Sequence, residues 1–244
     1  MLDRISVSDF VVGLPDLRRQ LGGAKNLPRL LDFPAFEFAG FHPDIIPVRI
    51  NGTLLQSPMG DYHSLMAAAG YRAGLSTRRV ISMYNALTYR AFGYFDAFAD
   101  LAPALIADYR KAGIEIAHLV ERWRRRGNFT HSINHPKAYV VADLTYTFCK
   151  AWGLDTPRPA EYGDFQPDPL NRYAVYPVFP ELARHLSLDC GSLVFKAIST
   201  PAGPHILSLA QFVERSFNIY AINKGEWTIT DRIAHCIAYM KDLR

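Results

Sequence analysis

Three short motifs in this sequence carry side chains that can accept, donate or hold a proton. They are FHPD with His42 and Asp44, GDYHS with Tyr62, His63 and Ser64, and INHP with Asn134 and His135. A neutral imidazole is a usable general base near pH 7. For each histidine alone a capping or structural role is the simpler interpretation, but His, Asn and Asp gather at functional sites more often than in cores. The candidates for catalysis are therefore His42, Asp44, His63 and His135.

Prolines and helix starts determine how these side chains are presented. Pro43 disfavours helical geometry at His42, which we expect on an extended segment or turn. We expect His63 in the first turn of a helix, and His135 as the N-cap of another helix that begins at Pro136. Unpaired N–H groups at a helix start favour a phosphate or carboxylate and a neutral imidazole. This placement predicts a base beside a position that binds anions.

The sequence argues against a serine nucleophile and a metal centre at these motifs. Ser64 follows His63 directly, and adjacent residues on a helix point in different directions; a G-x-S-x-G turn is also absent. The three candidate histidines do not share a metal-binding spacing such as H-E-x-x-H. We expect no metal, and we assign Tyr62, Ser64 and Asn134 to substrate or cofactor binding.

The run ERWRRRGNF places several arginines at the end of an expected helix. One interpretation is a solvated helix end, where positive charge complements the helix dipole. The other is a clamp in which Arg124 and Arg125 hold the phosphates of a nucleotide-like cofactor. Both interpretations remain open from the sequence.

Composition narrows the class of protein and its partners. The chain has 244 residues, 49% hydrophobic and 20% charged, with a formal net charge of +4. This bias is too small to indicate nucleic acid and suits a small anionic molecule. An odd number of widely spaced cysteines favours a reducing compartment, and we find no signal peptide and no apolar run long enough to span a membrane. We therefore expect a cytoplasmic protein without a transmembrane segment; its oligomeric state, a homo-oligomer included, is open.

The periodicity predicts an α/β fold dominated by helices, with a small sheet and one domain over residues 1–244. The expected helices are 57–74, 76–87, 100–126, 136–152, 208–220 and a last one carrying Ile233, Ile237 and Met240. Residues 192–199 are the best strand, and Ser208 with Gln211 has the spacing of a capping box. We expect a long covering loop over residues 156–180 and a sheet edge within the first forty residues.

The order of the motifs resembles a known family. FPAFEFAGFHPDI, GDYHS, HSINHPK, YPVFPELARHLSL and LSLAQFVERSFNIY follow one another as in the WcbI-type polysaccharide biosynthesis proteins, from about residue 7 to residue 220. The resemblance implies a role in building bacterial capsule or a related surface polysaccharide. It also implies binding of coenzyme A and transfer of an acyl group, typically acetyl from acetyl-CoA, to a sugar hydroxyl of a small or polymeric precursor. The implied site residues are His42, Asp44, Tyr62, His63, Ser64, Asn134 and His135.

The sequence departs from that family at its start. WcbI-type proteins usually open with a buried strand and a Gly-Asn-Cys turn, and no such turn precedes ISVSDF here. We expect either a truncated start or the loss of that part of the site. Two alternatives to an acyltransferase therefore stay open: a hydrolase of sugar esters that uses water, and a non-catalytic binding or assembly subunit of a polysaccharide biosynthesis complex.

Overall fold

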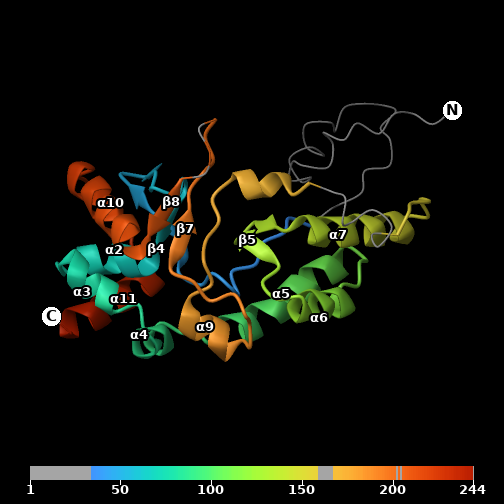
Figure 1. Cartoon of the computed structure of the whole chain (residues 1–244). Coiled ribbons are helices and arrows are strands. Elements are labelled where there is room, and N and C mark those ends of the chain that lie inside the picture. Colours follow the sequence, from blue (N-terminus) through green and yellow to red (C-terminus); the bar gives the residue numbers. More distant parts are fainter. Residues whose placement is uncertain (1–33, 159–166, 202, 204, 244) are drawn as a thin grey trace.

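The computed structural model describes residues 34–158, 167–201, 203 and 205–243 (Figure 1). The expected sheet edge within the first forty residues falls almost entirely outside these ranges. Within them, helices dominate and strands occur as short antiparallel pairs, which confirms the predicted helix-dominated α/β class. The pairs are β1 (Ile45–Pro47) with β4 (Tyr62–Ser64), β2 (Arg49–Ile50) with β3 (Thr53–Leu54), β5 (Thr130–Ser132) with β6 (His135–Pro136), and β7 (Val194–Lys196) with β8 (Ile206–Ser208).

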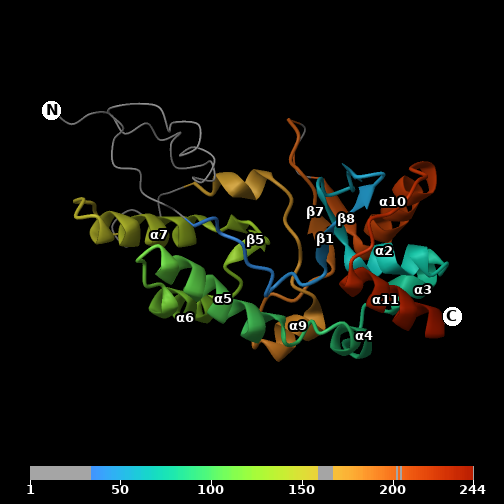
Figure 2. The same ribbon diagram turned by 180° about the vertical axis from the view of Figure 1, so that it is seen from behind.

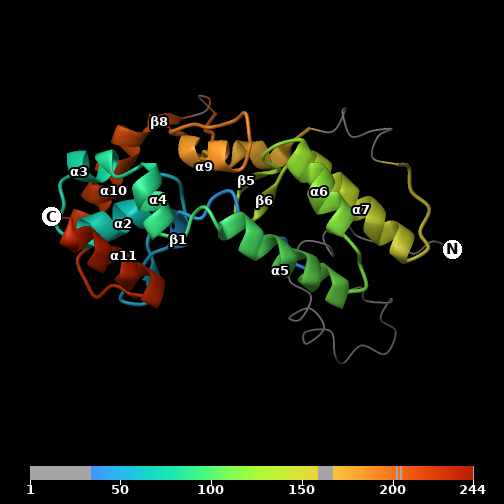
Figure 3. The same cartoon turned by 90° about the horizontal axis from the view of Figure 1, so that it is seen from below.

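The helices gather at two ends of the molecule. Near the C-terminus, α10 (Leu209–Ile222) and α11 (Asp231–Asp242) pack on α2 (Leu65–Arg72), and α10 also packs on α3 (Thr77–Ser82) (Figure 2). At the other end lie α5 (Ala97–Lys111), α6 (Ala117–Arg125) and α7 (Ala138–Ala151) (Figure 3). Between the two groups lies α9 (Pro180–His185), as Figure 3 shows, and α4 (Ala86–Ala91) contacts it. A short 3-10 helix, η3 (Pro169–Arg172), precedes α9 in the chain.

One hydrophobic cluster extends through both groups of helices. A cluster of aromatic rings packs the segment before β1 against the α5–α6 end. Phe41 packs edge-on against Phe129, with ring centroids 4.8 Å apart, and Phe38 stacks on Phe129 at 5.1 Å. Phe98 of α5 contacts both Phe38 and Phe41. His42 and Asp44 directly follow this aromatic cluster in the chain, so both residues are held in the core rather than on a free loop.

Several sequence predictions are confirmed. Ser76 caps α3 by accepting from the N–H of Arg79, and Ser208 and Gln211 form a complete capping box at α10. The helix over 138–151 lies within the predicted 136–152, and β7 lies inside the predicted strand. Ile233 and Met240 are buried on α11. These signals are local, so the sequence carries them without knowledge of the tertiary fold.

The helix predicted over 100–126 is in fact two helices. Gly113 adopts a left-handed φ of 78°, and the N–H of Ile114 returns to the carbonyl of Tyr109, which ends α5. Glu115 then accepts from the N–H of Ala117 at the start of α6. The helix predicted over 76–87 likewise ends at Ser82. Apolar spacing runs on across both breaks, and periodicity alone therefore did not reveal them.

The predicted starts of two helices were wrong. Residues 57–60 form a tight turn with Gly60 at a φ of 96°, so α2 begins only at Leu65 and His63 lies in β4. His135 is not an N-cap: it pairs with Ser132 in β6, and Lys137 occupies the position before α7. Pro136 suits the edge of a two-stranded pair as well as it suits a first helical turn, which explains the error.

Candidate functional site

The surface carries a pocket of about 460 Å³ whose wall is strongly basic. Five cationic side chains and a single carboxylate, that of Asp189, line it. The cations are Arg124, Arg125, Arg126, Lys137 and Lys196. We call this the basic pocket. Burial lowers the pKa of Lys137 and of Lys196 below the usual value for lysine, and Lys137 is the more deeply buried of the two. A concave site with so large an excess of positive charge attracts phosphate groups.

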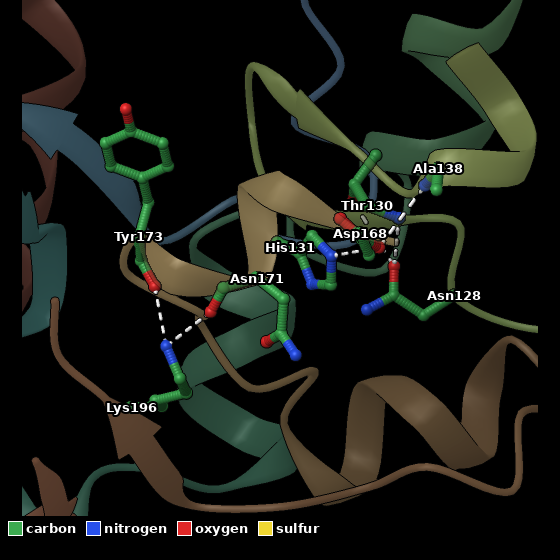
Figure 4. Close-up of polar contacts among 8 residues, drawn as sticks. All are labelled: Asn128, Thr130, His131, Ala138, Asp168, Asn171, Tyr173 and Lys196. Carbon is green, nitrogen blue, oxygen red and sulfur yellow. Dashed lines mark hydrogen bonds and ion pairs between the residues drawn. The ribbon is translucent and has the colours of Figure 1, made fainter. Parts of the chain in front are cut away.

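Neighbouring elements hold the cations in place. Lys196 of β7 donates through Nζ to the carbonyl groups of Asn171 (2.5 Å) and Tyr173 (2.9 Å), as Figure 4 shows. Arg124 lies over the ring of Phe98, 5.0 Å from its centroid, and Arg125 pairs with Glu121 on the same helix. Both arginines thus line the pocket at the end of α6. The sequence alone allowed two interpretations of this helix end, a phosphate clamp and a solvated surface.

The β5–β6 hairpin borders the basic pocket. Asn128, just before β5, and Lys137, just after β6, both line it. The side chain of Asn128 accepts from the N–H of Thr130 at 3.0 Å, which fixes the entry into the hairpin (Figure 4). The carbonyl of His131 accepts from the N–H of Tyr176 at 2.8 Å. The hairpin is therefore tied to the pocket wall on both sides.

Ser132, Asn134 and His135 form a hydrogen-bonded group on this hairpin. Ser132 Oγ donates to Asn134 Oδ1 (3.3 Å) and lies 2.8 Å from His135 Nδ1. Because the single Ser132 proton is used toward Asn134, the short contact is best satisfied by a proton on His135 Nδ1, which leaves Nε2 with a lone pair. The ring of His135 stacks on Tyr173, centroids 5.3 Å apart. Burial, and then the neighbouring His131, lower the pKa of His135 below 6.5.

His131 and Asp168 form a second pair beside this group. His131 Nε2 lies 2.8 Å from Asp168 Oδ2, and the N–H of Ala138 at the start of α7 donates to the same oxygen at 3.2 Å (Figure 4). His131 and His135 have an H-x-x-x-H spacing, but on a hairpin they bind different partners. In the part of the chain that the structure describes, no three His, Cys, Asp or Glu side chains are placed to hold a metal ion.

His42 lies buried behind the hairpin. Its side chain is 3% exposed, and neither ring nitrogen makes a hydrogen bond, although the backbone groups of Pro177 and Thr130 lie near enough to favour its protonated form. Burial dominates and lowers its pKa to about 4. Nearby His131 and Lys137 lower it further. His42 is thus a neutral imidazole close to the hairpin but enclosed in the core.

The motif GDYHS lies at the α2 end, in a separate hydrogen-bond network. His63 uses both ring nitrogens: Nε2 donates to the carbonyl of Leu55 (3.0 Å) and Nδ1 accepts from the hydroxyl of Tyr220 (2.9 Å). Burial lowers its pKa to about 4. Ser64 Oγ caps α2 by accepting from the N–H of Ala67. These contacts give both side chains structural partners.

Asp44 and Tyr62 complete that network. Asp44 Oδ1 accepts from the N–H of Met66 (2.9 Å) and from the hydroxyl of Tyr94 (2.6 Å), and burial raises its pKa to about 6. The carbonyl of Tyr62 accepts from the hydroxyl of Tyr176 at 2.8 Å. Asp44 makes no hydrogen bond to His42, two residues away. Of the residues that the sequence singled out, Arg124 and Arg125 line the basic pocket, and Asn134 and His135 lie on the hairpin whose two ends, Asn128 and Lys137, also line it. Asp44 and Ser64 instead cap α2, and His63 binds Leu55 and Tyr220.

Sequence reasoning missed half of the hairpin site. His131 and Ser132 lie inside THSINHPK, but of the two histidines in this motif the sequence analysis singled out only His135. Asp168 lies in a proline-rich loop and Lys196 in a strand, far along the chain. The available signal was the run of polar side chains through THSINH, interrupted only by Ile133, because His, Ser and Asn gather at functional sites more often than in cores.

The family model described as "Polysaccharide biosynthesis enzyme WcbI" matches residues 8–157, more than half of the chain. The chain belongs to the WcbI family. The match includes the β5–β6 hairpin and the three arginines, while Asp168 and Lys196 lie beyond it. The family is thus one of polysaccharide biosynthesis enzymes.

A solved structure of WcbI is similar to this chain at 14% sequence identity, with a TM-score of 0.48. The match covers 87% of this chain and 66% of that one, so the chain spans slightly less than two thirds of the solved protein's length. That protein is described as a novel polysaccharide biosynthesis enzyme, in a native form without a disulfide bond between coenzyme A and a cysteine. A search of curated proteins returns no match. Among the helices described in this WcbI family member, none is both long and apolar enough to cross a membrane.

Proposed function

We propose that this WcbI family member binds coenzyme A and transfers an acyl group, typically acetyl, to a sugar hydroxyl of a bacterial surface polysaccharide precursor in the cytoplasm. The observation that carries the proposal is the basic pocket, which is lined by both ends of a hairpin that bears His135, a histidine with a lowered pKa whose Nε2 makes no hydrogen bond to the described residues. Family membership supports the pathway, and the pocket and hairpin support the reaction.

The residues of the pocket fit the cofactor. Coenzyme A carries several phosphate charges, and five cations against one carboxylate offer the complementary field. Lys137 and Arg124 are the best-placed phosphate ligands, because Lys137 is half-buried beside the hairpin and Arg124 is fixed over Phe98. When bound, coenzyme A supplies the acyl group as an activated thioester.

His135 acts as the general base in this proposal. Ser132 holds Nδ1, so Nε2 is placed to accept the proton of a sugar hydroxyl as its oxygen bonds to the acyl carbon, and to return that proton to the sulfur as the carbon–sulfur bond breaks. The lowered pKa keeps the imidazole neutral and ready at pH 7. Asn134 accepts from Ser132 through Oδ1, which leaves its NH₂ group to stabilise the oxyanion.

A second candidate reaction has one observation in its favour. If the Ser132 hydroxyl turns its proton toward His135, the 2.8 Å contact becomes a serine and base pair of the kind that hydrolases use. The chain would then cleave sugar esters with water. The basic pocket favours the transferase, because ester hydrolysis needs no phosphate site.

The first test compares coenzyme A with pantetheine, which lacks the phosphates, by isothermal titration calorimetry of the full chain. We expect coenzyme A to bind and pantetheine to bind at least about tenfold more weakly, since each charge-assisted hydrogen bond contributes roughly 1.5–3 kcal/mol. Replacing Lys137 and Arg124 with Gln should weaken coenzyme A to a similar extent. Arg78→Gln, at an exposed position of α3, is the matched control.

Two results would count against the proposal. Equal binding of coenzyme A and pantetheine would remove the phosphate role of the basic pocket. Absence of binding by either ligand, with a folded protein, would favour the hydrolase or a non-catalytic subunit; release of acetate from an acetylated sugar without coenzyme A then separates these two.

A further inference from the structure

The ring of Tyr173 covers one face of the His135 imidazole. The two rings are stacked, with an interplanar angle of 9° and centroids 5.3 Å apart. Tyr173 directly follows η3 and is half-buried. Ser132 contacts the same imidazole at its edge, through Nδ1. His135 thus has one partner at the edge of its ring and another on its face.

Neither partner alone fixes the direction of His135 Nε2. A hydrogen bond to Nδ1 holds one atom of the ring, but the imidazole can still tilt about that contact, because the terminal torsion of histidine is broad. A flat ring against its face limits this tilt, since the stacked arrangement is lost when one ring turns. Ser132 and Tyr173 together therefore determine where the Nε2 lone pair points.

Tyr173 is itself held by its neighbours. Lys196, which lines the basic pocket, donates to the carbonyl of Tyr173 at 2.9 Å (Figure 4). The guanidinium of Arg172 donates to the Tyr173 hydroxyl at 3.0 Å and lies 5.0 Å from the centroid of its ring. The N–H of Tyr173 donates to the carbonyl of Leu170 at 3.1 Å. Both the backbone and the ring of Tyr173 are therefore fixed.

Asp168, at the other end of η3, ties this short helix to the hairpin that bears His135. Asp168 Oδ2 lies 2.8 Å from His131 Nε2 and accepts from the N–H of Ala138 at 3.2 Å. The segments that carry Tyr173 and His135 are thus joined a second time, which fixes how the two rings meet.

We propose that Tyr173 is a positioning residue, whose ring sets the plane of the His135 imidazole and so directs Nε2 at the acceptor hydroxyl. Tyr173 acts through His135 and takes no part in the bonds that form or break. Its role in acyl transfer rests on the proposed function. Its effect on the imidazole does not, and can be measured without coenzyme A.

Proton–nitrogen NMR correlation spectra of the histidine rings measure this effect in the full chain. Among the eight histidines, the signals of His135 are those lost in His135→Asn. We expect Tyr173→Ala to lower the share of the Nδ1–H tautomer, because the ring is then free to turn away from Ser132. The pKa of His135 should rise toward 6.5, because burial is the main cause that lowers it. Tyr173→Phe keeps the flat ring and should restore both values.

The comparison of these two variants isolates the ring from changes in charge. The titratable side chains on the hairpin and on residues 168–176, which contact His135, are those of His131, Lys137, Asp168, Arg172, Tyr173 and Tyr176. Ala and Phe both remove the Tyr173 hydroxyl and leave the others in place. A difference between Tyr173→Ala and Tyr173→Phe therefore reports on the ring alone.

In acetyl transfer, Tyr173→Ala should lower kcat by about 10- to 100-fold, since a small displacement of a catalytic group has an effect of that size. The affinity for coenzyme A should stay unchanged, because the cations of the basic pocket are retained. Tyr173→Phe should restore most of the lost kcat, and Tyr146→Ala, half-buried on α7, is the matched control. If circular dichroism shows Tyr173→Ala to be unfolded, Tyr173→Leu, which fills the space without a flat ring, should show the same change in tautomer and kcat.

Different results overturn this inference and the proposed function. If the tautomer and pKa of His135 are unchanged in Tyr173→Ala, or if Tyr173→Phe does not restore them, Tyr173 does not position the ring. If the ring turns but kcat is unchanged, its role in catalysis is overturned. If both NMR values change as expected while the original chain transfers no acetyl group, the positioning of His135 stands and the acyltransferase proposal fails.

Discussion

His63 and His135 are the same residue type in opposite situations. His63 has both ring nitrogens in hydrogen bonds to Leu55 and Tyr220 and is fully buried. Proton transfer between His63 and a substrate would therefore require these bonds to break and the core to open. His135 is half-buried, with one nitrogen held by Ser132. Only the second arrangement leaves a lone pair for a substrate. A neutral histidine is thus necessary but not sufficient for a base; the free nitrogen decides.

Replacing His135 with Asn should lower kcat for acyl transfer by about 10²- to 10⁴-fold, because a positioned general base contributes that much. The affinity for coenzyme A should stay unchanged, which calorimetry checks. In the original chain the rate should fall as pH drops below 6.5, since a lowered pKa places protonation of His135 there. His118→Asn, exposed on α6, is the matched control. Unchanged kcat in His135→Asn would rule out His135 as the base.

At the scale of elements, two segments that are distant in the sequence cap α2 together. Ser64 accepts from the N–H of Ala67, and Asp44 accepts from the N–H of Met66. Both acceptors belong to strands of the β1–β4 pair or its approach, so the strand pair and the helix start form one unit. Capping explains the conspicuous Asp44 and Ser64 without any catalytic role.

Replacing Asp44 with Asn tests this capping role through pH. The folded-state pKa of Asp44 is raised to about 6 by burial, so the original chain loses stability as pH rises from about 4 through 6 and the carboxyl ionises. Asn keeps an acceptor oxygen and carries no charge. The free energy of unfolding of Asp44→Asn, relative to the original chain, should therefore rise by about 1–3 kcal/mol between pH 4 and pH 7.5.

Urea denaturation at the two pH values measures the effect. Asp242→Asn, exposed on α11, should show no such change relative to the original chain. A difference that is the same at both pH values would mean that Asp44 does not ionise in this range, and the burial argument would be wrong.

On the scale of the whole molecule, two groups of helices share one hydrophobic cluster. Trp123 lies in the α6 end, where its ring nitrogen donates to Asp143 at 2.7 Å, and Trp227 packs against Tyr220 at the α10 end. Both side chains are buried. A continuous core predicts that the chain unfolds as one cooperative unit, as a single domain should.

Variants that keep only Trp123 or only Trp227, with the other tryptophans replaced by Phe, report on the two ends separately. In each variant the fluorescence transition in urea should coincide with its own circular dichroism transition. Comparison within one variant removes the effect of the substitutions on stability. A fluorescence midpoint that departs from the circular dichroism midpoint in either variant would indicate two separately folding domains.

Much of the fold could be predicted because its signals are local. Cap residues such as Ser76 and Ser208, and the apolar spacing of residues 138–151, depend only on neighbours within a few positions. The same locality explains the errors: Pro136 suits a strand and a helix start equally, and only pairing with Thr130 decided for the strand. Gly113 broke a helix whose apolar spacing continued past it.

The sequence by itself determined the helix-dominated class, the capped starts of α3 and α10, and a basic, histidine-bearing chain that resembles the WcbI family. Tertiary structure alone decided which side chains meet. His131 meets Asp168 across 37 positions and His63 meets Tyr220 across 157, distances over which no local pattern extends. Burial then separated His135 from the enclosed His42 and His63, because solvent exposure and hydrogen-bond partners are properties of the folded chain and not of residue type.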